Sequence, residues 1–332
     1  MRGSISPWGC PSFAPLRITE RRSISPGRAL RTRPASLRRC GRQKRLRRAV
    51  PGADDKALPP LREVIQRHGL APLKRFGQHF LTDPRLIARI AAVAGDLTQG
   101  MVIEIGPGPG GLTRALLAAG AQRLVAVEYD ERCLAALEEL VSVYPDRLEI
   151  IAGDALKVDV ARIGTPPRKI VANLPYNIST VLLTQWLAQA QAFAGLTLMF
   201  QKEVADRLMA VPRTKSYGRL SVLAQATCRV VKNFDLPPGA FHPPPKVTST
   251  VVTLTPHETP LPCRVGTLEA CTAAAFGQRR KVLRTSLRRW TPAAEALLEE
   301  TGLNAGARAE ELTPGDFVRL AVAHDRDFPD GQ

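Results

Sequence analysis

The sequence lacks the marks of disulfide-rich, zinc-binding and membrane-spanning proteins. None of its six cysteines forms a Cys-x-x-Cys pair, and no His and Cys residues have the spacing of a zinc site. No apolar run reaches the roughly 18 residues that span a bilayer, and the N-terminus has no apolar signal-peptide core. Scattered cysteines in a long chain are typical of buried or free thiols in a reducing compartment. We therefore expect a soluble, cytoplasmic protein that holds no metal.

Acidic residues are nearly absent from the first 50 positions. This stretch has fourteen Lys and Arg residues and one acid, Glu20, so it carries +13 of the chain's net charge of +17. It has almost no hydrophobic periodicity, and such a segment cannot bury enough apolar surface to offset its chain entropy. We expect residues 1–56 to be a disordered basic extension. Three origins stay open: an RNA-binding arm, an organelle-type targeting peptide, or a start site assigned too early.

From Leu58 onward, short apolar strands alternate with amphipathic helices. We expect strands at Met101–Ile105, Leu124–Val127, Leu148–Ala152, Lys169–Ala172 and Thr197–Phe200. We expect helices at Leu61–His68, Leu112–Ala119, Asp130–Val141, Ser179–Ala190 and Val204–Ala210, with one more after Asp83. Such repeated units predict a doubly wound, mostly parallel α/β sheet, to which Val230–Phe234 and Thr250–Leu254 add an antiparallel hairpin. Past Pro262 the pattern is helical, which places a domain boundary in the Pro-rich stretch 256–264.

A Gly-rich turn follows the first expected strand. It reads Glu104-Ile105-Gly106-Pro107-Gly108-Pro109-Gly110-Gly111. Glycines let the backbone turn sharply and approach a ligand closely. Pro107 and Pro109 remove amides that a pyrophosphate would need. The turn therefore favours a nucleoside ligand without a diphosphate over a dinucleotide.

Two carboxylates end the next two strands. Glu128 comes 22 residues after Gly106, where an acid faces the ligand crevice and can accept both hydroxyls of a ribose. Asp154, in Gly153-Asp154-Ala155, can accept the amino group of an adenine. Two acids around one pocket favour a ligand that carries a sulfonium and an ammonium group.

The fourth strand leads into Asn173-Leu174-Pro175-Tyr176-Asn177-Ile178-Ser179, at the edge where ligands of open α/β sheets bind. An adenine amine is a poor nucleophile because its lone pair is delocalised into the ring. The Asn173 side-chain oxygen and a neighbouring backbone carbonyl can accept both amine protons, which favours a pyramidal, nucleophilic nitrogen. The face of Tyr176 can stack the base, a contact worth roughly 1–3 kcal/mol.

A second aromatic residue, Phe241, begins the Pro-rich run Phe241-His242-Pro243-Pro244-Pro245-Lys246-Val247-Thr248-Ser249. The prolines predict a stiff loop that holds Phe241 over the other face of a base flipped out of its stack. His242 is interpreted as a surface residue, because water can take the proton after transfer.

These motifs together resemble the bacterial ribosomal small-subunit adenine dimethyltransferases. The resemblance covers roughly residues 60–325. It rests on Lys74–Leu81, Glu104–Thr113, Glu128, Gly153–Ala155, Asn173–Thr180, Gln201–Val204, Tyr217–Ser221, Phe241–Ser249 and Phe276–Lys281. The chain differs at His79, where many relatives have Asn, and in its long basic extension, which bacterial relatives generally lack. Both His and Asn can donate a hydrogen bond.

The resemblance implies a function and a set of site residues. It implies a Rossmann-like class I methyltransferase domain at 57–258 and a small all-α rRNA-docking domain at 259–332. Dimethylation of two adjacent adenosines in the 3′-terminal hairpin loop of 16S rRNA is implied, on an assembling 30S subunit. The implied cofactor is S-adenosylmethionine, leaving S-adenosylhomocysteine, and we expect a monomer. Its implied contacts are His79, Leu81, Gly106, Glu128, Asp154 and Asn173; the catalytic set is Asn173, Leu174, Pro175, Tyr176 and Phe241.

A basic stretch without any acid is expected to dock the rRNA. We predict one helix that carries Arg279, Arg280, Lys281, Arg284, Arg288 and Arg289. Val282, Leu283 and Leu287 supply its apolar side, so the cations face outward. Phosphate contacts of this kind set the position of an RNA without reading its sequence.

Three other functions compete with this one. The first is methylation of large-subunit rRNA by the related antibiotic-resistance enzymes, against which the run Gln278-Arg279-Arg280-Lys281 argues. The second is a non-catalytic RNA-binding or transcription factor on the same fold, against which the intact Asn173–Tyr176 argues. The third is a dehydrogenase, which the prolines of the Gly-rich turn disfavour.

Overall fold

The computed structural model describes residues 58–72 and 78–328. The predicted basic extension and residues 74–77 of the Lys74–Leu81 motif lie outside these ranges. The described residues all belong to one unit, 54–332. The boundary predicted at 256–264 therefore stays a prediction.

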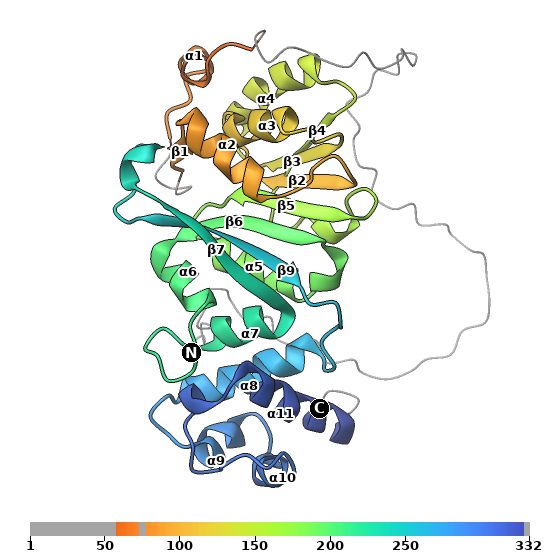
Figure 1. The fold of residues 1–332 in the computed structure, drawn as a ribbon, viewed down its shortest axis with the longest axis vertical. Helices are drawn as coiled ribbons and strands as arrows, with labels where there is room; N and C mark the ends of the chain where they lie inside the picture. Colours follow the sequence, from red (N-terminus) through yellow and green to blue (C-terminus); the bar gives the residue numbers. More distant parts are fainter. Residues whose placement is uncertain (1–57, 73–77, 329–332) are drawn as a thin grey trace, which may run out of the picture. The chain divides into compact units, whose positions relative to one another are not determined.

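A seven-stranded sheet runs through the centre of this unit (Figure 1). Its order is β4-β3-β2-β5-β6-β9-β7, and the first five strands in that order are parallel. These five are β2 (Met101–Ile105), β3 (Leu124–Glu128), β4 (Leu148–Ala152), β5 (Arg168–Asn173) and β6 (Gly195–Gln201). The doubly wound sheet predicted from the alternating pattern is confirmed.

The antiparallel end of the sheet is also confirmed. β9 (Ser249–Pro256) pairs antiparallel with both β6 and β7 (Cys228–Leu236). A bulge between Lys232 and Phe234 shifts the register of β7. A second, two-stranded sheet joins β1 (Phe80–Leu81) to β8 (Phe241–His242), and the periodicity of the sequence does not predict it.

Helices cover both faces of the large sheet, because successive strand residues point to opposite sides. On one face lie α2 (Pro84–Val93), α3 (Gly111–Ala118) and α4 (Glu131–Val143), whose apolar residues form one core with Val102. On the other lie α5 (Ser179–Leu187), α6 (Lys202–Leu208) and α7 (Arg219–Thr227), whose core includes Ile103. A short helix, α1 (Leu61–Arg67), precedes them. No described helix is long and apolar enough to cross a membrane.

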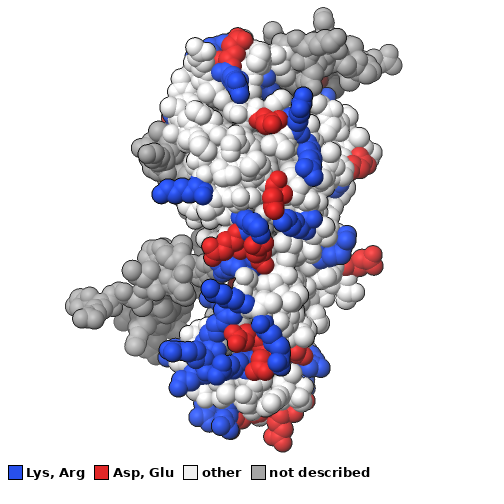
Figure 2. Space-filling model, turned by 60° about the vertical axis from the view of Figure 1, so that its left-hand side comes forward, with Lys and Arg blue, Asp and Glu red and all other residues white. Residues whose placement is uncertain are grey.

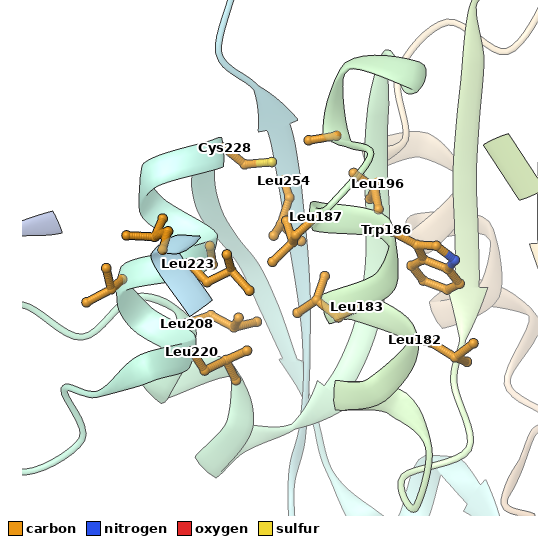
Figure 3. Packing of buried hydrophobic residues seen from close by; sticks show 14 of the residues in the cluster. Leu182, Leu183, Trp186, Leu187, Leu196, Leu208, Leu220, Leu223, Cys228 and Leu254 are labelled. Atoms are coloured by element: carbon orange, nitrogen blue, oxygen red, sulfur yellow. The ribbon is translucent and has the colours of Figure 1, made fainter. Parts of the chain in front are cut away.

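The C-terminal helices share the second core. They are α8 (Val265–Gly277), α9 (Leu283–Ser286), α10 (Ala294–Glu300) and α11 (Pro314–Asp327). Their buried residues belong to the same cluster as the strand residues under α5. Figure 3 shows Leu183 and Leu187 of α5 pointing toward Leu220 and Leu223 of α7 across this core. α7 in turn contacts α8 and α11, so the helical region is joined to the sheet through α7.

The predicted basic helix over Arg279–Arg289 is wrong. α8 ends at Gly277, Arg279–Lys281 form a turn, and Val282 is extended with φ −73° and ψ 158°. Val282 pairs with Arg308 as an isolated β-bridge, and the Leu283 amide donates to the Ala307 carbonyl. These contacts with a distant segment stabilise an extended backbone that helix periodicity does not reveal.

Candidate active site

A cavity of about 300 Å³ opens at the carboxyl ends of β2, β3, β4 and β5. Its lining comes from the turn after β2, the ends of the other three strands, and the segment 78–81 before and within β1. Four acids line it, and no Lys or Arg among the described residues does. The acids are Glu104, Glu128, Asp130 and Asp154. The cavity therefore favours a ligand with positive charge.

The carboxylate of Glu128 holds the Gly-rich turn against the end of β3. Its Oε2 accepts the Gly108 amide at 2.9 Å, and its Oε1 accepts the amides of Tyr129 and Asp130 at 2.9 and 2.8 Å. Gly108 has a φ of +56°, which L side chains rarely adopt, so glycine is required where this amide meets Glu128. Burial raises the pKa of Glu128, and the three amide hydrogen bonds oppose that rise.

Asn173, the last residue of β5, is oriented by a backbone group from another element. Its Nδ2 donates to the carbonyl of His79 at 3.4 Å. The His79 ring is held in turn, because its Nδ1 donates to the carbonyl of Pro243 at 2.8 Å. With Nδ2 engaged, the amide presents Oδ1 of Asn173 as its acceptor. An acceptor at this edge of the sheet can receive a proton of an amine placed in the cavity.

Two contacts hold the side chain of Tyr176 in place, one at its hydroxyl and one at its ring. Its hydroxyl shares a hydrogen bond of 2.6 Å with the Ser249 hydroxyl, and its ring stacks with His79 at 5.7 Å between centroids. Burial raises the pKa of the Tyr176 hydroxyl, and the bond to Ser249 opposes the shift. Tyr176 is therefore a neutral aromatic platform beside Asn173.

The structure brings nearly all predicted site residues together. His79, Leu81, Gly106, Glu128, Asp154, Asn173, Leu174, Pro175 and Tyr176 all line the cavity. Phe241 does not: it is 4% exposed and pairs with Leu81 in the two-stranded sheet. In this structure Phe241 packs in the core instead of covering a base, and its predicted stacking role is not supported by its position.

Sequence reasoning gave no role to three residues of the cavity wall. Glu104 is 1% exposed, and its Oε2 has no hydrogen-bond partner among the described residues. Asp130 accepts a bond from Gln78 and is paired with Arg132, which lowers the pKa of Asp130. Tyr129, next to Glu128, is 63% exposed. The signal that could have identified them is their place in the sequence: Glu104 begins the Gly-rich motif, and Tyr129 and Asp130 directly follow Glu128.

The predicted docking cations divide into two groups. Arg279 pairs with Glu310 at 2.7 Å and donates to the carbonyls of Thr214 and Lys215, and Arg288 pairs with Glu295 at 2.6 Å. The others, Arg280, Lys281, Arg284 and Arg289, are exposed and form no ion pair within the described ranges. Figure 2 shows Lys and Arg side chains crowded in the lower part of the view, at the height of the C-terminal helices in Figure 1.

We predict that Glu128→Ala lowers the stability of the protein as well as altering its cavity. The substitution leaves three amides without their acceptor, and hydrogen bonds to charged groups contribute about 1.5–3 kcal/mol each. Asp154→Ala is the matched control, because Asp154 accepts only the Leu156 amide in the described structure. Urea unfolding should show a clearly larger loss for Glu128→Ala. Equal losses would show that Glu128 does not hold the turn.

The chain is similar to curated ribosomal RNA methyltransferases over most of its length. A ribosomal RNA small subunit methyltransferase A from Paramagnetospirillum magneticum is 60% identical over 275 residues, which cover 82% of this chain and 98% of that protein. The corresponding protein from Rhodospirillum rubrum is 57% identical over 269 residues, 81% of this chain and 93% of its own length.

Solved structures show the same architecture. A dimethyladenosine transferase from Plasmodium falciparum superposes with a TM-score of 0.65 at 25% identity, over 75% of this chain and 98% of that one. The 23S rRNA methyltransferase ErmE superposes with a TM-score of 0.55 at 29% identity, over 73% and 97%. The family described as ribosomal RNA adenine dimethylase matches residues 72–325. With this match and relatives of such identity, the chain belongs to the ribosomal RNA adenine dimethylase family.

Proposed function

We propose that this chain dimethylates the N6 amines of two adjacent adenosines in the 3′-terminal hairpin loop of small-subunit rRNA, with S-adenosylmethionine as the methyl donor. The observation that carries the proposal is the orientation of Asn173 by His79, in a cavity whose other wall is acidic. Relatives at 57–60% identity are named as small-subunit rRNA methyltransferases, which supports the choice of RNA.

The acidic cavity fits S-adenosylmethionine, which carries a sulfonium and an ammonium group. Glu128 and Asp154 lie at the ends of adjacent strands, where the first can hold the ribose and the second the adenine. The backbone at Gly106, with a φ of +66°, and the side chains of His79 and Leu81 complete the wall. When bound, this cofactor supplies an electrophilic methyl group.

The residues at the end of β5 prepare the amine. Oδ1 of Asn173 and a nearby backbone carbonyl accept the two N6 protons, which localises the nitrogen lone pair toward the methyl group. In the transfer the new N–C bond forms as the C–S bond breaks, and the displaced amine proton goes to water. Tyr176 stacks the base, while Leu174 and Pro175 shape the floor beneath it. In a second transfer, from a second molecule of the methyl donor, the monomethylated amine has one N6 proton left for one of the two acceptors, and loss of that proton to water leaves the dimethylated amine.

For Phe241 to stack on a base, its side chain would have to leave its buried position beside Leu81. In the described structure Phe241 is buried against the core of α2 and α3. While Phe241 is buried, only Tyr176 of the two predicted aromatic residues is therefore available to stack a base.

The C-terminal helices are proposed to dock the rRNA in an assembling 30S subunit. Arg280, Lys281, Arg284 and Arg289 are the cations available for phosphates, whereas Arg279 and Arg288 are engaged with acids of the chain itself. We expect the enzyme to act in the cytoplasm as a monomer. The large-subunit alternative has support in the similarity to ErmE, but the more identical relatives are named for the small subunit.

The decisive variant for catalysis is Asn173→Ala. It should lower methyl transfer to unmethylated small subunits by about 100-fold or more, the range seen when one polar group that acts in the transition state is removed. Binding of small subunits should change little, because Asn173 contacts one amine and no phosphate. Asn177→Ala, in the same cavity wall, is the control. Near-normal turnover of Asn173→Ala would rule out this mechanism.

A matched pair of variants tests the docking surface. Arg280→Ala should weaken binding of small subunits and reduce the log–log salt slope by about 0.7–0.9, the value for one lost phosphate contact. Arg279→Ala should leave that slope nearly unchanged, because Arg279 is already paired with Glu310. Arg123→Ala, directly before β3, is a control that should keep the parent's slope. If Arg280→Ala keeps that slope too, the rRNA docks elsewhere.

A further inference from the structure

Glu104 is the most deeply buried charged group of the cavity. It is 1% exposed, lies one residue before the end of β2 and lines the cavity. Its Oε2 has no hydrogen-bond partner in the described part of the chain. An unpartnered buried carboxylate is costly, since burial without compensation penalises the charged form. Burying the charged form of Glu104 therefore costs free energy that no contact within the described structure offsets.

No cation of the described protein compensates Glu104. The carboxylate of Glu128, at the end of β3, faces Glu104. Asp154, after β4, and His79, before β1, line the same cavity. From α3 the neighbour is the Thr113 hydroxyl, while Arg114 donates to the carbonyl of Pro59. A positive charge near Glu104 must therefore come from a ligand.

Three of the four acids of the wall, Glu104, Glu128 and Asp154, differ in how many of their oxygens already have a hydrogen-bond partner. Both oxygens of Glu128 accept backbone amides, and Asp154 accepts the Leu156 amide. Glu104 alone of these three has a fully buried oxygen without a hydrogen-bond partner inside the described structure. This difference distinguishes Glu104 as the group whose charge state can respond to a ligand.

We propose that Glu104 is a proton-linked counter-ion: it carries a proton while the cavity holds no cation, and it releases that proton to solvent when a cationic ligand enters. The inference rests on the proposed cofactor. The positive charge of the ligand replaces the proton as the partner of the carboxylate, so no charge is left uncompensated in either state.

The direction of the pH dependence follows from the titration of Glu104. Burial raises the pKa of this carboxyl to about 8; the Thr113 hydroxyl opposes the rise and the charge of Glu128 adds to it. Below that pKa the free protein must lose a proton in order to bind. Affinity should therefore fall roughly tenfold for each pH unit below the pKa of Glu104. The amine of the ligand titrates at about pH 7.7–8.0 and so stays mostly charged at pH 6–7.

Calorimetry with the full-length protein tests the proposal without an activity assay. S-adenosylmethionine is titrated at pH 7.0 in buffers of different ionisation enthalpy, which gives the number of protons released per ligand bound. The parent should release close to one proton. Glu104→Gln, an isosteric mimic of the protonated acid, should release close to none, and its affinity should lose most of its pH dependence. 5′-Methylthioadenosine, which lacks both cationic groups, should bind the parent without proton release.

Thr113→Val provides a second measurement on a chain that keeps Glu104. Removing the hydroxyl that opposes the shift should move the pH dependence of binding to higher pH. Equal proton release by the parent and Glu104→Gln, or release with 5′-methylthioadenosine, would overturn the inference. A parent that binds no S-adenosylmethionine at all would instead overturn the proposed function, so the two failures are distinguishable.

Discussion

The hydrogen bonds from three backbone amides to the carboxylate of Glu128 are the constraint on which the site depends. They join the turn after β2 to the end of β3, and so fix the backbone around Gly106 and Gly108. The turn lies close to the segment after β5, since a Cβ added at Gly106 would lie 3.7 Å from Pro175. One buried acid therefore holds the turn that lies beside the segment after β5.

A second network closes the other side of the cavity. The β1–β8 pair brings the segment before Phe80 against the loop after Phe241. In this segment, the ring of His79 donates a hydrogen bond to the carbonyl of Pro243, and the backbone carbonyl of His79 accepts one from Asn173. The Tyr176–Ser249 bond ties the reaction edge to β9 in the same way. Residues distant in sequence thus orient Asn173 and Tyr176, the two groups that we propose meet the base.

The parts of this structure that local sequence patterns determine could be predicted. Strands such as Met101–Ile105 are short, buried and mostly apolar. The start of α2 could be predicted because Asp83 is a good N-cap residue, and its side chain accepts the amides of Arg85 and Leu86. The cavity residues from Gly106 to Tyr176 were predicted because parallel strands end at one edge. Their roles came from the chemistry of the ligand and from resemblance to a family.

The parts that depend on distant contacts could not be predicted. The turn at Arg279–Lys281 follows from the bridge between Val282 and Arg308, which no local pattern shows. Burial of Phe241 follows from its pairing with Leu81. Oε2 of Glu104 likewise has no hydrogen-bond partner among the described residues because the surrounding elements bring no donor within reach, and the local sequence does not show this.

The most direct test of the account is a crystal structure of the protein with S-adenosylhomocysteine. The account predicts the ribose at Glu128, the adenine at Asp154 and the sulfur on the Asn173 side of the cavity, with the turn at Gly108 unchanged. A ligand bound outside this cavity, or one with its ribose remote from Glu128, would contradict it.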